Sequence, residues 1–357
     1  MHRLLAGAII ISVVACEDSI GPGVRGRLFG PASLAVEWSV DGTEIYHYSS
    51  GFSSTVPVFI PDQILATNAA TGASRVVVGS CVWSIGATIR PTIMPPRATV
   101  AGLVYLEGCT PTALAVRLRS GASDSILAGT KGWFTSCPNR DCVIYAVADT
   151  STSDDSIGVI DLPQGDRRVF GIGGYRPSDA AAVSPDGTAL LLEQTGVTNR
   201  FAILNLASGA LDTLPDSILP FPYEGGTPLG WNHDGLWFLA EPRITIVRYD
   251  PATGGIERFS TGDMTGGTRV MTGGSITATT SVISYQNCIS YDPQTLDCTQ
   301  VAYGLWLWNP LLALDRQLEL FYTPAHDFPR MFHAATSPNG QQVAYVLGNE
   351  LRVVAAP

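Results

Sequence analysis

Ser184-Pro185-Asp186-Gly187 is followed directly by five largely apolar residues, TALLL, and this combination governs how the rest of the chain is interpreted. Asp-Gly or Asn-Gly between apolar runs is the strongest short-range hairpin signal, because glycine adopts positive φ without steric cost. Variants of the stretch return as Trp38-Ser39-Val40-Asp41-Gly42, Trp231-Asn232-His233-Asp234-Gly235 and Ser337-Pro338-Asn339-Gly340. The sequence therefore predicts a tight β-hairpin at each of these four places.

A second hairpin follows several of these stretches. Its short turn carries a glycine and lies between two apolar runs, at residues 70–72, 163–165, 207–209 and 250–254. Alternating strands and tight turns at this density are typical of all-β proteins. Each unit is therefore expected to contain four short strands.

The spacing of the first hairpins gives the number of units. Asp41, Asp186, Asp234 and Asn339 are separated by 145, 48 and 105 residues, which correspond to about three, one and two steps. Six steps connect seven units, and the weaker copies are expected near 99–127, 133–170 and 270–320. A period of about 40–50 residues with four strands per unit predicts a β-propeller. We expect seven blades, with six as the alternative.

The last unit supplies only three strands before the chain ends. A strand near residues 24–29 would complete this blade, cover its exposed edge and close the ring. We therefore expect a single propeller domain over residues 24–357.

The units resemble the WD40-like (PD40) repeats of the TolB type, which carry S-P-D-G at the first hairpin and D-x-x-T/S-G at the second. This resemblance implies the propeller fold. TolB-like proteins place an α/β domain before the propeller, whereas here the repeats start almost at once. The periplasmic partners of that family are therefore not transferred to this chain.

The N-terminus has the pattern of an export signal. A short positive start precedes the uncharged run 4–15, which is too short to span a bilayer as a helix. Val13-Val14-Ala15-Cys16 resembles the lipobox of bacterial lipoproteins, which implies cleavage after residue 15 and acylation of Cys16. Residues 16–23 are polar and turn-rich and suit a tether. We expect a lipid-anchored envelope protein, in the outer membrane and facing the periplasm or the surface; an ordinary secretory signal is the alternative.

Composition limits the partners. Only 15% of the residues are charged, and the formal net charge is −10. An acidic chain is repelled by nucleic acids and by anionic lipid. We therefore expect no nucleic-acid partner, membrane attachment through the lipid alone, and a monomer.

Six cysteines remain if Cys16 is acylated, and an even number in an oxidising compartment indicates disulfides. Six cysteines allow 15 connectivities, among which sequence alone does not choose. Proximity favours the pairs Cys137–Cys142 and Cys288–Cys298, which leaves Cys81–Cys109. Zinc is the alternative, but the chain has no C-x-x-C motif and no histidine near these positions.

Calcium is the one cofactor for which the chain offers a weak signal. Residues 149–155, DTSTSDD, place oxygen ligands at alternate positions, as calcium loops do. The sixth place lacks glycine, and Ile160 stands where an EF-hand needs glutamate. A solvated hairpin loop is the simpler interpretation, with weak calcium binding as the alternative and no other cofactor expected.

In a propeller, the connections that enter the innermost strands gather at one mouth of the central channel. Aromatic and arginine side chains on such loops are typical recognition anchors, and ordinary loop packing is the alternative. These residues are the candidate binding site for a peptide or small ligand: Tyr175, Arg176, Tyr223, Glu224, Arg330, Phe332 and His333.

No catalytic motif appears. The chain lacks G-x-S-x-G and any H-E-x-x-H spacing. We therefore expect a non-catalytic binding or interaction scaffold whose partner is an envelope protein or a small ligand. The alternative is a propeller enzyme, a lactonase-like or lyase-like hydrolase with a channel metal. That alternative needs polar side chains on inner strands, whereas 180–183 and 334–336 are small or apolar.

Overall fold

The structure is a computed structural model that describes residues 27–356, except for 32, 53–58, 80–95, 111–112, 139, 148–155, 163, 179–182, 198–199, 220–226, 241–244, 261–268, 277–280, 292–297, 310, 312–313, 325–330 and 348–349. In part of the strands, and in most of those between 269 and 333, only the backbone is described. The predicted signal peptide (1–15) and tether (16–23), including Cys16, lie outside the described residues.

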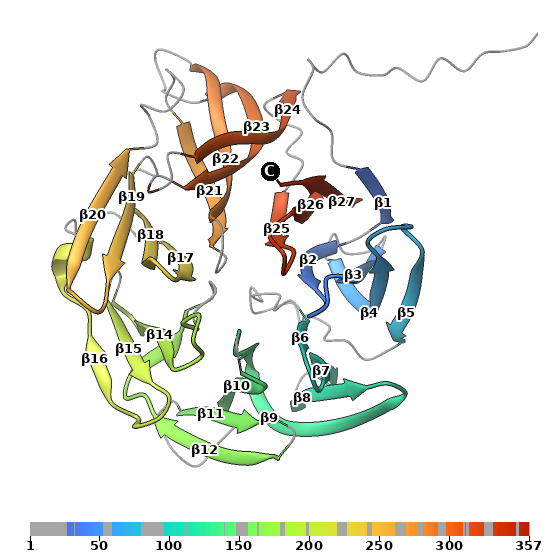
Figure 1. Ribbon diagram of the computed structural model, residues 1–357, viewed down its shortest axis with the longest axis vertical. Coiled ribbons are helices and arrows are strands. Elements are labelled where there is room, and N and C mark those ends of the chain that lie inside the picture. Colours follow the sequence, from blue (N-terminus) through green and yellow to red (C-terminus); the bar gives the residue numbers. More distant parts are fainter. Residues whose placement is uncertain are drawn as a thin grey trace, which may run out of the picture.

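Antiparallel sheets form a ring around a common axis (Figure 1), which confirms the predicted all-β propeller. We number the blades along the chain. Blade 1 contains β2 (Ser33–Trp38), β3 (Glu44–Phe52), β4 (Phe59–Asn68) and β5 (Ser74–Val78). Blade 2 contains β6 (Arg97–Thr99), β7 (Gly102–Thr110), β8 (Ala113–Ser120) and the first part of β9 (Ser123–Ser136). Blade 3 contains the rest of β9, β10 (Cys142–Val147), β11 (Ser156–Asp161) and β12 (Asp166–Gly171).

The remaining blades follow the same order. Blade 4 contains β13 (Tyr175–Pro177), β14 (Ala189–Gln194), β15 (Phe201–Asn205) and β16 (Leu211–Thr213), and the short 3-10 helix η1 (Asp216–Ile218) follows it. Blade 5 contains β17 (Thr227–Asn232), β18 (Gly235–Ala240), β19 (Thr245–Asp250) and β20 (Gly255–Ser260). Blade 6 contains β21 (Arg269–Ile276), β22 (Ser281–Tyr291), β23 (Cys298–Asn309) and β24 (Leu314–Pro324). Blade 7 contains β25 (Met331–Thr336), β26 (Gln342–Leu347), β27 (Glu350–Ala355) and β1 (Arg27–Pro31).

Blades 2 and 3 are joined in one seven-stranded sheet because β9 belongs to both. Its first part pairs with β8 and its second part with β10, and Thr130 pairs with a residue of each, Leu114 and Val147. The Thr130 hydroxyl donates a hydrogen bond to the Ala146 carbonyl over 2.7 Å at this crossing point. The single long strand therefore serves as the outer strand of one blade and the inner strand of the next.

The core lies between the blades. The middle strands are buried on both faces by neighbouring sheets, which is why β14 and β18 are apolar without alternation. One cluster of buried side chains runs through blades 2 to 5, and Phe201 of blade 4 meets Phe238 of blade 5 with ring centroids 5.1 Å apart. Each blade is thus stabilised chiefly by its neighbours.

The N-terminal strand closes the ring, as the sequence predicted near residues 24–29; it is described over 27–31, and residues 24–26 lie outside the described residues. β1 pairs with β27 in an antiparallel register that joins Arg27 to Val353. The Arg27 guanidinium also donates to the Ala70 carbonyl of blade 1 over 3.0 Å, and the Trp38 indole of blade 1 donates to the Ala335 carbonyl of blade 7 over 2.9 Å. The first and last blades are therefore joined by side chains as well as by backbone.

Arginine side chains connect other neighbouring blades. Arg97 of blade 2 binds Glu37 of blade 1 over 3.0 Å, and Arg352 of blade 7 binds the fully buried Glu319 of blade 6 over 3.2 Å. Removing one partner of a buried ion pair leaves an uncompensated charge, so these contacts fix how adjacent blades fit together.

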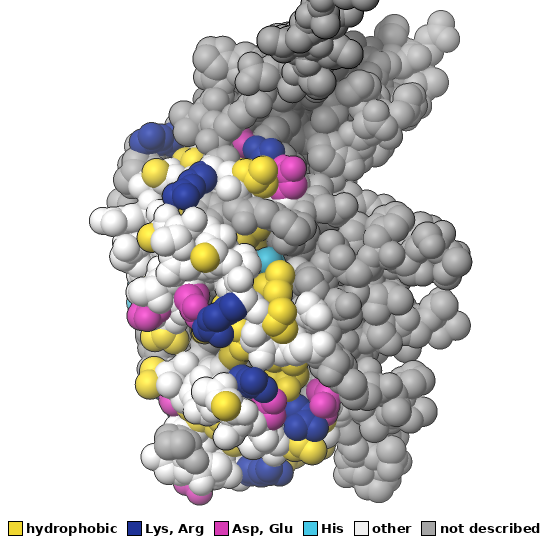
Figure 2. Space-filling view, turned by 90° about the vertical axis from the view of Figure 1, so that its right-hand side faces the viewer, with side chains coloured by type: hydrophobic (Ala, Val, Ile, Leu, Met, Phe, Trp, Pro, Cys, Tyr) yellow, Lys and Arg dark blue, Asp and Glu magenta, His cyan; other side chains and the backbone are white. Residues whose placement is uncertain are grey.

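The side of the ring seen in Figure 2 mixes basic and acidic side chains, with hydrophobic ones between them in small groups. Cross-strand ion pairs such as Arg75–Glu44 in blade 1, at 2.8 Å, belong to this kind of surface. Within the described residues, no helix is long or apolar enough to cross a membrane.

Candidate functional site

The described tight turns that follow the first and third strands of the blades lie on one face of the ring, which we call the turn face. Strands within a blade alternate in direction, so the turn after the first strand and the turn after the third strand fall on the same side. The first residue of each innermost strand accordingly lies toward the opposite face.

Three first turns share one hydrogen-bond network. The Ser184 hydroxyl donates to Asp186 Oδ1 over 2.5 Å and accepts from the backbone N–H of Ala189 over 2.9 Å. The Thr188 N–H donates to the same carboxylate over 3.0 Å. Ser39 and Asp41 in blade 1 repeat this arrangement, and so do Ser337 and Asn339 in blade 7. The carboxylate or amide oxygen therefore holds the turn in each of these blades.

Protonation chemistry agrees with this role. The hydrogen bond from Ser39 is the main reason that the pKa of Asp41 lies below its usual range. Burial opposes ionisation of Asp186, but hydrogen bonds from Ser184 and Thr188 outweigh it and lower the pKa of that carboxyl as well. Both side chains are consequently ionised near neutral pH.

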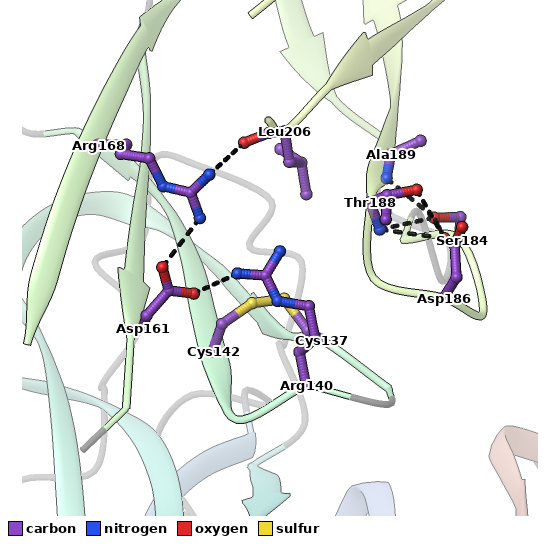
Figure 3. The surroundings of a disulfide bond; sticks show 10 residues. All are labelled: Cys137, Arg140, Cys142, Asp161, Arg168, Ser184, Asp186, Thr188, Ala189 and Leu206. Carbon is purple, nitrogen blue, oxygen red and sulfur yellow. Dashed lines mark hydrogen bonds and ion pairs between the residues drawn. A yellow bond between two sulfur atoms is a disulfide. The ribbon is translucent and has the colours of Figure 1, made fainter. Parts of the chain in front are cut away.

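The first hairpin of blade 3 has no Asp-Gly but is closed by the same backbone hydrogen bond. The Cys137 N–H donates to the Cys142 carbonyl over 3.1 Å, as Ser184 does to Ala189 over 2.9 Å. Cys137 and Cys142 form a disulfide across the turn, with Cα atoms 5.3 Å apart (Figure 3). The disulfide thus occupies the position at which the other turns use a serine hydroxyl. This equivalence was not predicted from the sequence, because the blade 3 turn lacks the Asp-Gly or Asn-Gly pair that marks the other turns.

Charged side chains surround the disulfide turn. Asp161, at the end of β11, forms ion pairs with Arg140 and Arg168, the latter at 3.0 Å (Figure 3). Arg168 also donates to the Leu206 carbonyl of blade 4 over 2.7 Å. The turn face is therefore continuous across the junction of blades 3 and 4.

A groove interrupts the turn face at the next junction. It has a volume of about 340 Å³ and lies between the first turn of blade 4 and both turns of blade 5. Its walls include Pro185 and Asp186 from blade 4, with Trp231, Asp234 and Asp250 from blade 5. From the sequence, these residues were expected only to form turns, and no pattern in it predicts a groove between them.

The predicted channel-mouth site is described only in part. Tyr175 and Arg176 lie in β13, where Tyr175 packs against the core and Arg176 forms an ion pair with Glu193, its register partner, at 3.0 Å. Tyr223, Glu224 and Arg330 lie outside the described residues, and Phe332 and His333 lie in β25 without described side chains. Binding at this mouth stays a prediction.

The remaining cysteines cannot be paired from the described residues. Cys81 lies outside them, while Cys109, Cys288 and Cys298 lie in strands whose side chains are not described there. The backbone register places Cys288 opposite Val301 and Cys298 opposite Tyr291.

The predicted calcium loop, 149–155, also lies outside the described residues. Among those that are described, no group of three or more histidine, cysteine, aspartate or glutamate side chains is placed to hold a metal ion.

One buried group is held neutral. The His47 ring in β3 lies 2.7 Å from the Thr67 hydroxyl, and its side chain is only 1% exposed. Burial lowers the pKa of His47 to about 4. In the same blade, burial raises the pKa of Glu37, and Arg97 opposes that rise.

Solved structures similar to this chain are β-propellers of diverse kinds. The β-propeller domain of Cps50 (Swd1) from Myceliophteria thermophila has a TM-score of 0.56 and 10% identity, over 92% of this chain and 97% of that one. The propeller domain of the Trilobed protease from Pyrococcus furiosus has a TM-score of 0.51 and 13% identity, over 83% and 85%. An oligogalacturonate lyase in complex with manganese has a TM-score of 0.57 and 9% identity, over 94% and 98%.

No protein-family model matches the chain, and no curated protein is similar to it in sequence. The structural likeness therefore shows the propeller fold alone, since such low identities carry no function.

Proposed function

We propose that this protein is an exported, lipid-anchored component of the cell envelope whose propeller is a non-catalytic binding scaffold. The lipobox-like residues before Cys16 support the anchor. The propeller supports the scaffold role, because loops and turns held on a rigid frame are the usual place for binding.

The observation that carries the proposal is that polar side chains on the turn face form hydrogen bonds within their own turns. Asp41, Asp186 and Asn339 are each committed to hydrogen bonds that hold their own turn. Catalytic groups have to converge on a reacting atom, whereas these groups make a rigid surface. A rigid surface with exposed side chains between its turns suits recognition.

The anchor is tested by mass spectrometry of the mature N-terminus in the native host or a bacterial host that processes lipoproteins. The expected mature chain starts at Cys16 and carries a diacylglyceryl group. Cys16→Ser should remain unacylated and should leave the membrane fraction. A mature chain that keeps residues 1–15, or that fractionates with membranes despite Cys16→Ser, would refute the anchor.

Binding is tested by photo-crosslinking in cells. A photoreactive residue at Val40 or Val100 samples the turn face, because these side chains are 51% and 82% exposed. Arg176 samples the opposite mouth, and Ile126 on the outer strand of blade 2 is the control, at 60% exposure. A discrete envelope protein captured from either face but not from Ile126 supports the scaffold, with Arg176 reporting on the predicted mouth. Equal capture from all positions, or none, contradicts it.

Metal analysis of the purified protein separates the scaffold from the lactonase-like or lyase-like alternative. A stoichiometric metal ion that survives dialysis would favour the enzyme. The same measurement in calcium-containing buffer tests the weak calcium site.

A further inference from the structure

The first hairpin of blade 5 is shorter than those of blades 1, 4 and 7, and blade 2, in which Thr99 pairs directly with Gly102, has an equally short one. In blades 1, 4 and 7, the backbone N–H of the serine reaches the carbonyl five residues later, as Ser184 reaches Ala189. In blade 5, Asn232 pairs directly with Gly235, so that only His233 and Asp234 form the loop. Asn232 holds this loop by accepting hydrogen bonds from the Asp234 N–H and the Trp237 indole, both at 2.9 Å.

The shorter loop changes the contact between blades. At two other junctions, the turn of one blade packs against the turn glycine of the next. Pro338 Cδ lies 3.5 Å from where a Cβ of Gly42 would be, and Cys137 Cβ lies 3.3 Å from that position on Gly187. In blade 5 the glycine of the Asp-Gly pair, Gly235, instead pairs with Asn232 at the end of the shortened loop and faces the Tyr249 carbonyl of its own blade. The groove of about 340 Å³ lies between the turn of blade 4 and this shortened hairpin of blade 5.

The walls of the groove are acidic. Among the described residues that line it, Asp186, Asp234 and Asp250 carry carboxylates, Arg248 carries a guanidinium and His233 carries an imidazole. Arg248 is already engaged, since it donates to the Asp234 carbonyl over 2.5 Å and to Glu257 over 2.8 Å. Hydrogen bonding, first from Thr253, holds the pKa of Asp250 below its usual range. The groove therefore presents net negative charge at neutral pH.

The rest of the wall includes the apolar residues Pro185, Pro251 and Trp231, the last of which also packs against the core. Such a wall accepts the methylene stem of a long side chain, and an indole also attracts a cation. A bare metal ion fits this groove poorly, because among the described residues no three acidic or histidine side chains come close enough to bind one. An organic cation is larger and can contact acidic side chains that lie farther apart.

We propose that the groove between blades 4 and 5 binds a lysine or arginine side chain presented by a partner protein. The inference rests on the proposed scaffold function and adds a site and a chemical class of ligand to it. The partner's positive charge meets Asp186, Asp234 and Asp250, and its aliphatic stem lies along the apolar wall.

Fluorine NMR of the full chain labelled with 5-fluorotryptophan provides the test. The seven tryptophans give separate reporters, and Trp231→Phe identifies the one in the groove. The probes are the blocked tripeptides Gly-Arg-Gly and Gly-Lys-Gly, with Gly-Gln-Gly as the neutral control. The basic peptides should shift the Trp231 signal saturably at millimolar concentration, and added salt should weaken the effect.

The charge is then removed without removing the turn. Asn339 holds the equivalent turn of blade 7 through an amide oxygen, so Asp186→Asn should keep its fold. Asp186→Asn combined with Asp234→Asn should weaken binding of the basic peptides by about fivefold, the effect expected for two exposed charge pairs. Asp212→Asn with Asp216→Asn, the same charge change on exposed residues at the outer edge of blade 4, should leave binding unchanged.

Three outcomes would overturn the inference: no shift of the Trp231 signal, equal binding of the neutral peptide, or unchanged affinity in the groove variant. None of them would refute the scaffold function if photo-crosslinking still captures a partner elsewhere on the ring. Failure of crosslinking at every position would instead refute the scaffold function.

Discussion

At the scale of single residues, His47 couples the fold to pH. Its ring is buried between β3 and β4, with the Thr67 hydroxyl 2.7 Å from one nitrogen and the Tyr48 carbonyl 3.3 Å from the other. Both contacts suit a neutral imidazole. Protonation would place an unpaired positive charge in the interior of blade 1, which is why the pKa falls to about 4.

The consequence is a loss of stability in acid. The pKa of His47 is about 6.5 in the unfolded chain, so the unfolded state takes up a proton first as the pH falls. Stability should be complete above pH 6.5 and should decline toward pH 4, by about 2.5 kcal/mol at pH 4.5. Urea unfolding at pH 7.5 and pH 4.5 measures this, and His47→Gln should lose less over that interval. His233→Gln, an exposed ring, is the control; equal acid sensitivity of His47→Gln and the parent would contradict the prediction.

Alanine substitutions at two glycines with positive φ distinguish the stability cost of backbone strain from the cost of a steric clash. Gly254, at φ +71°, has open space where a side chain would be, whereas Gly235, at φ +138°, faces the Tyr249 carbonyl. Gly254→Ala should cost about 1 kcal/mol, the usual penalty for a left-handed alanine. Gly235→Ala should cost at least twice as much, because the backbone of β19 has to move. Thermal unfolding of both variants checks the order, and a smaller loss for Gly235→Ala would refute it.

At the scale of elements, the turns explain which blades the sequence revealed. Blades 1, 4, 5 and 7 carry Asp-Gly or Asn-Gly, so their hairpins could be predicted from local chemistry alone. The blade 3 turn reaches the same backbone geometry with a disulfide, which no Asp-Gly search detects. The groove depends on a two-residue shortening in blade 5, and its effect appears only where two blades meet. Contacts between blades are set by packing rather than by local sequence, so they could not be predicted.

The equivalence of disulfide and serine can be tested directly. Cys137→Ala with Cys142→Ala removes the crosslink and should cost about 2 kcal/mol, the value expected for so short a loop. Cys137→Ser with Cys142→Ala creates the repeat's own hydrogen-bonding residue and should recover about 1 kcal/mol of that loss. Urea unfolding of both double variants measures the difference. Equal stability of the two would show that the blade 3 turn does not share the serine-based design.

At the scale of the whole molecule, the repeat spacing predicted a ring of sheets, and the strand missing from the last unit predicted its closure by an N-terminal strand. The described strand, 27–31, overlaps the predicted 24–29, and its register with β27 gives the pairing that closes the ring. The channel-mouth residues were chosen by their position in the fold; of the two whose side chains are described, Tyr175 packs against the core of blades 2 to 5 and Arg176 pairs with Glu193 of blade 4. The topology could thus be predicted from the sequence, whereas the contacts that surface side chains make within the fold could not.

Closure by β1 should control the stability of the entire ring. A chain that starts at Ser33 lacks the strand, exposes the edge of β27 and loses the Arg27 contact to blade 1. Its melting temperature should fall by about 5 °C or more, and the open edge should promote self-association. A chain that starts at Val24 retains β1 and should match the parent, while Arg27→Ala in the full chain should show only a small part of the loss. Thermal unfolding and light scattering measure both effects. If the chain from Ser33 melts with the parent and stays equally monodisperse, the pairing of β1 with β27 contributes nothing to closure, and the ring must be held by its interblade cores alone.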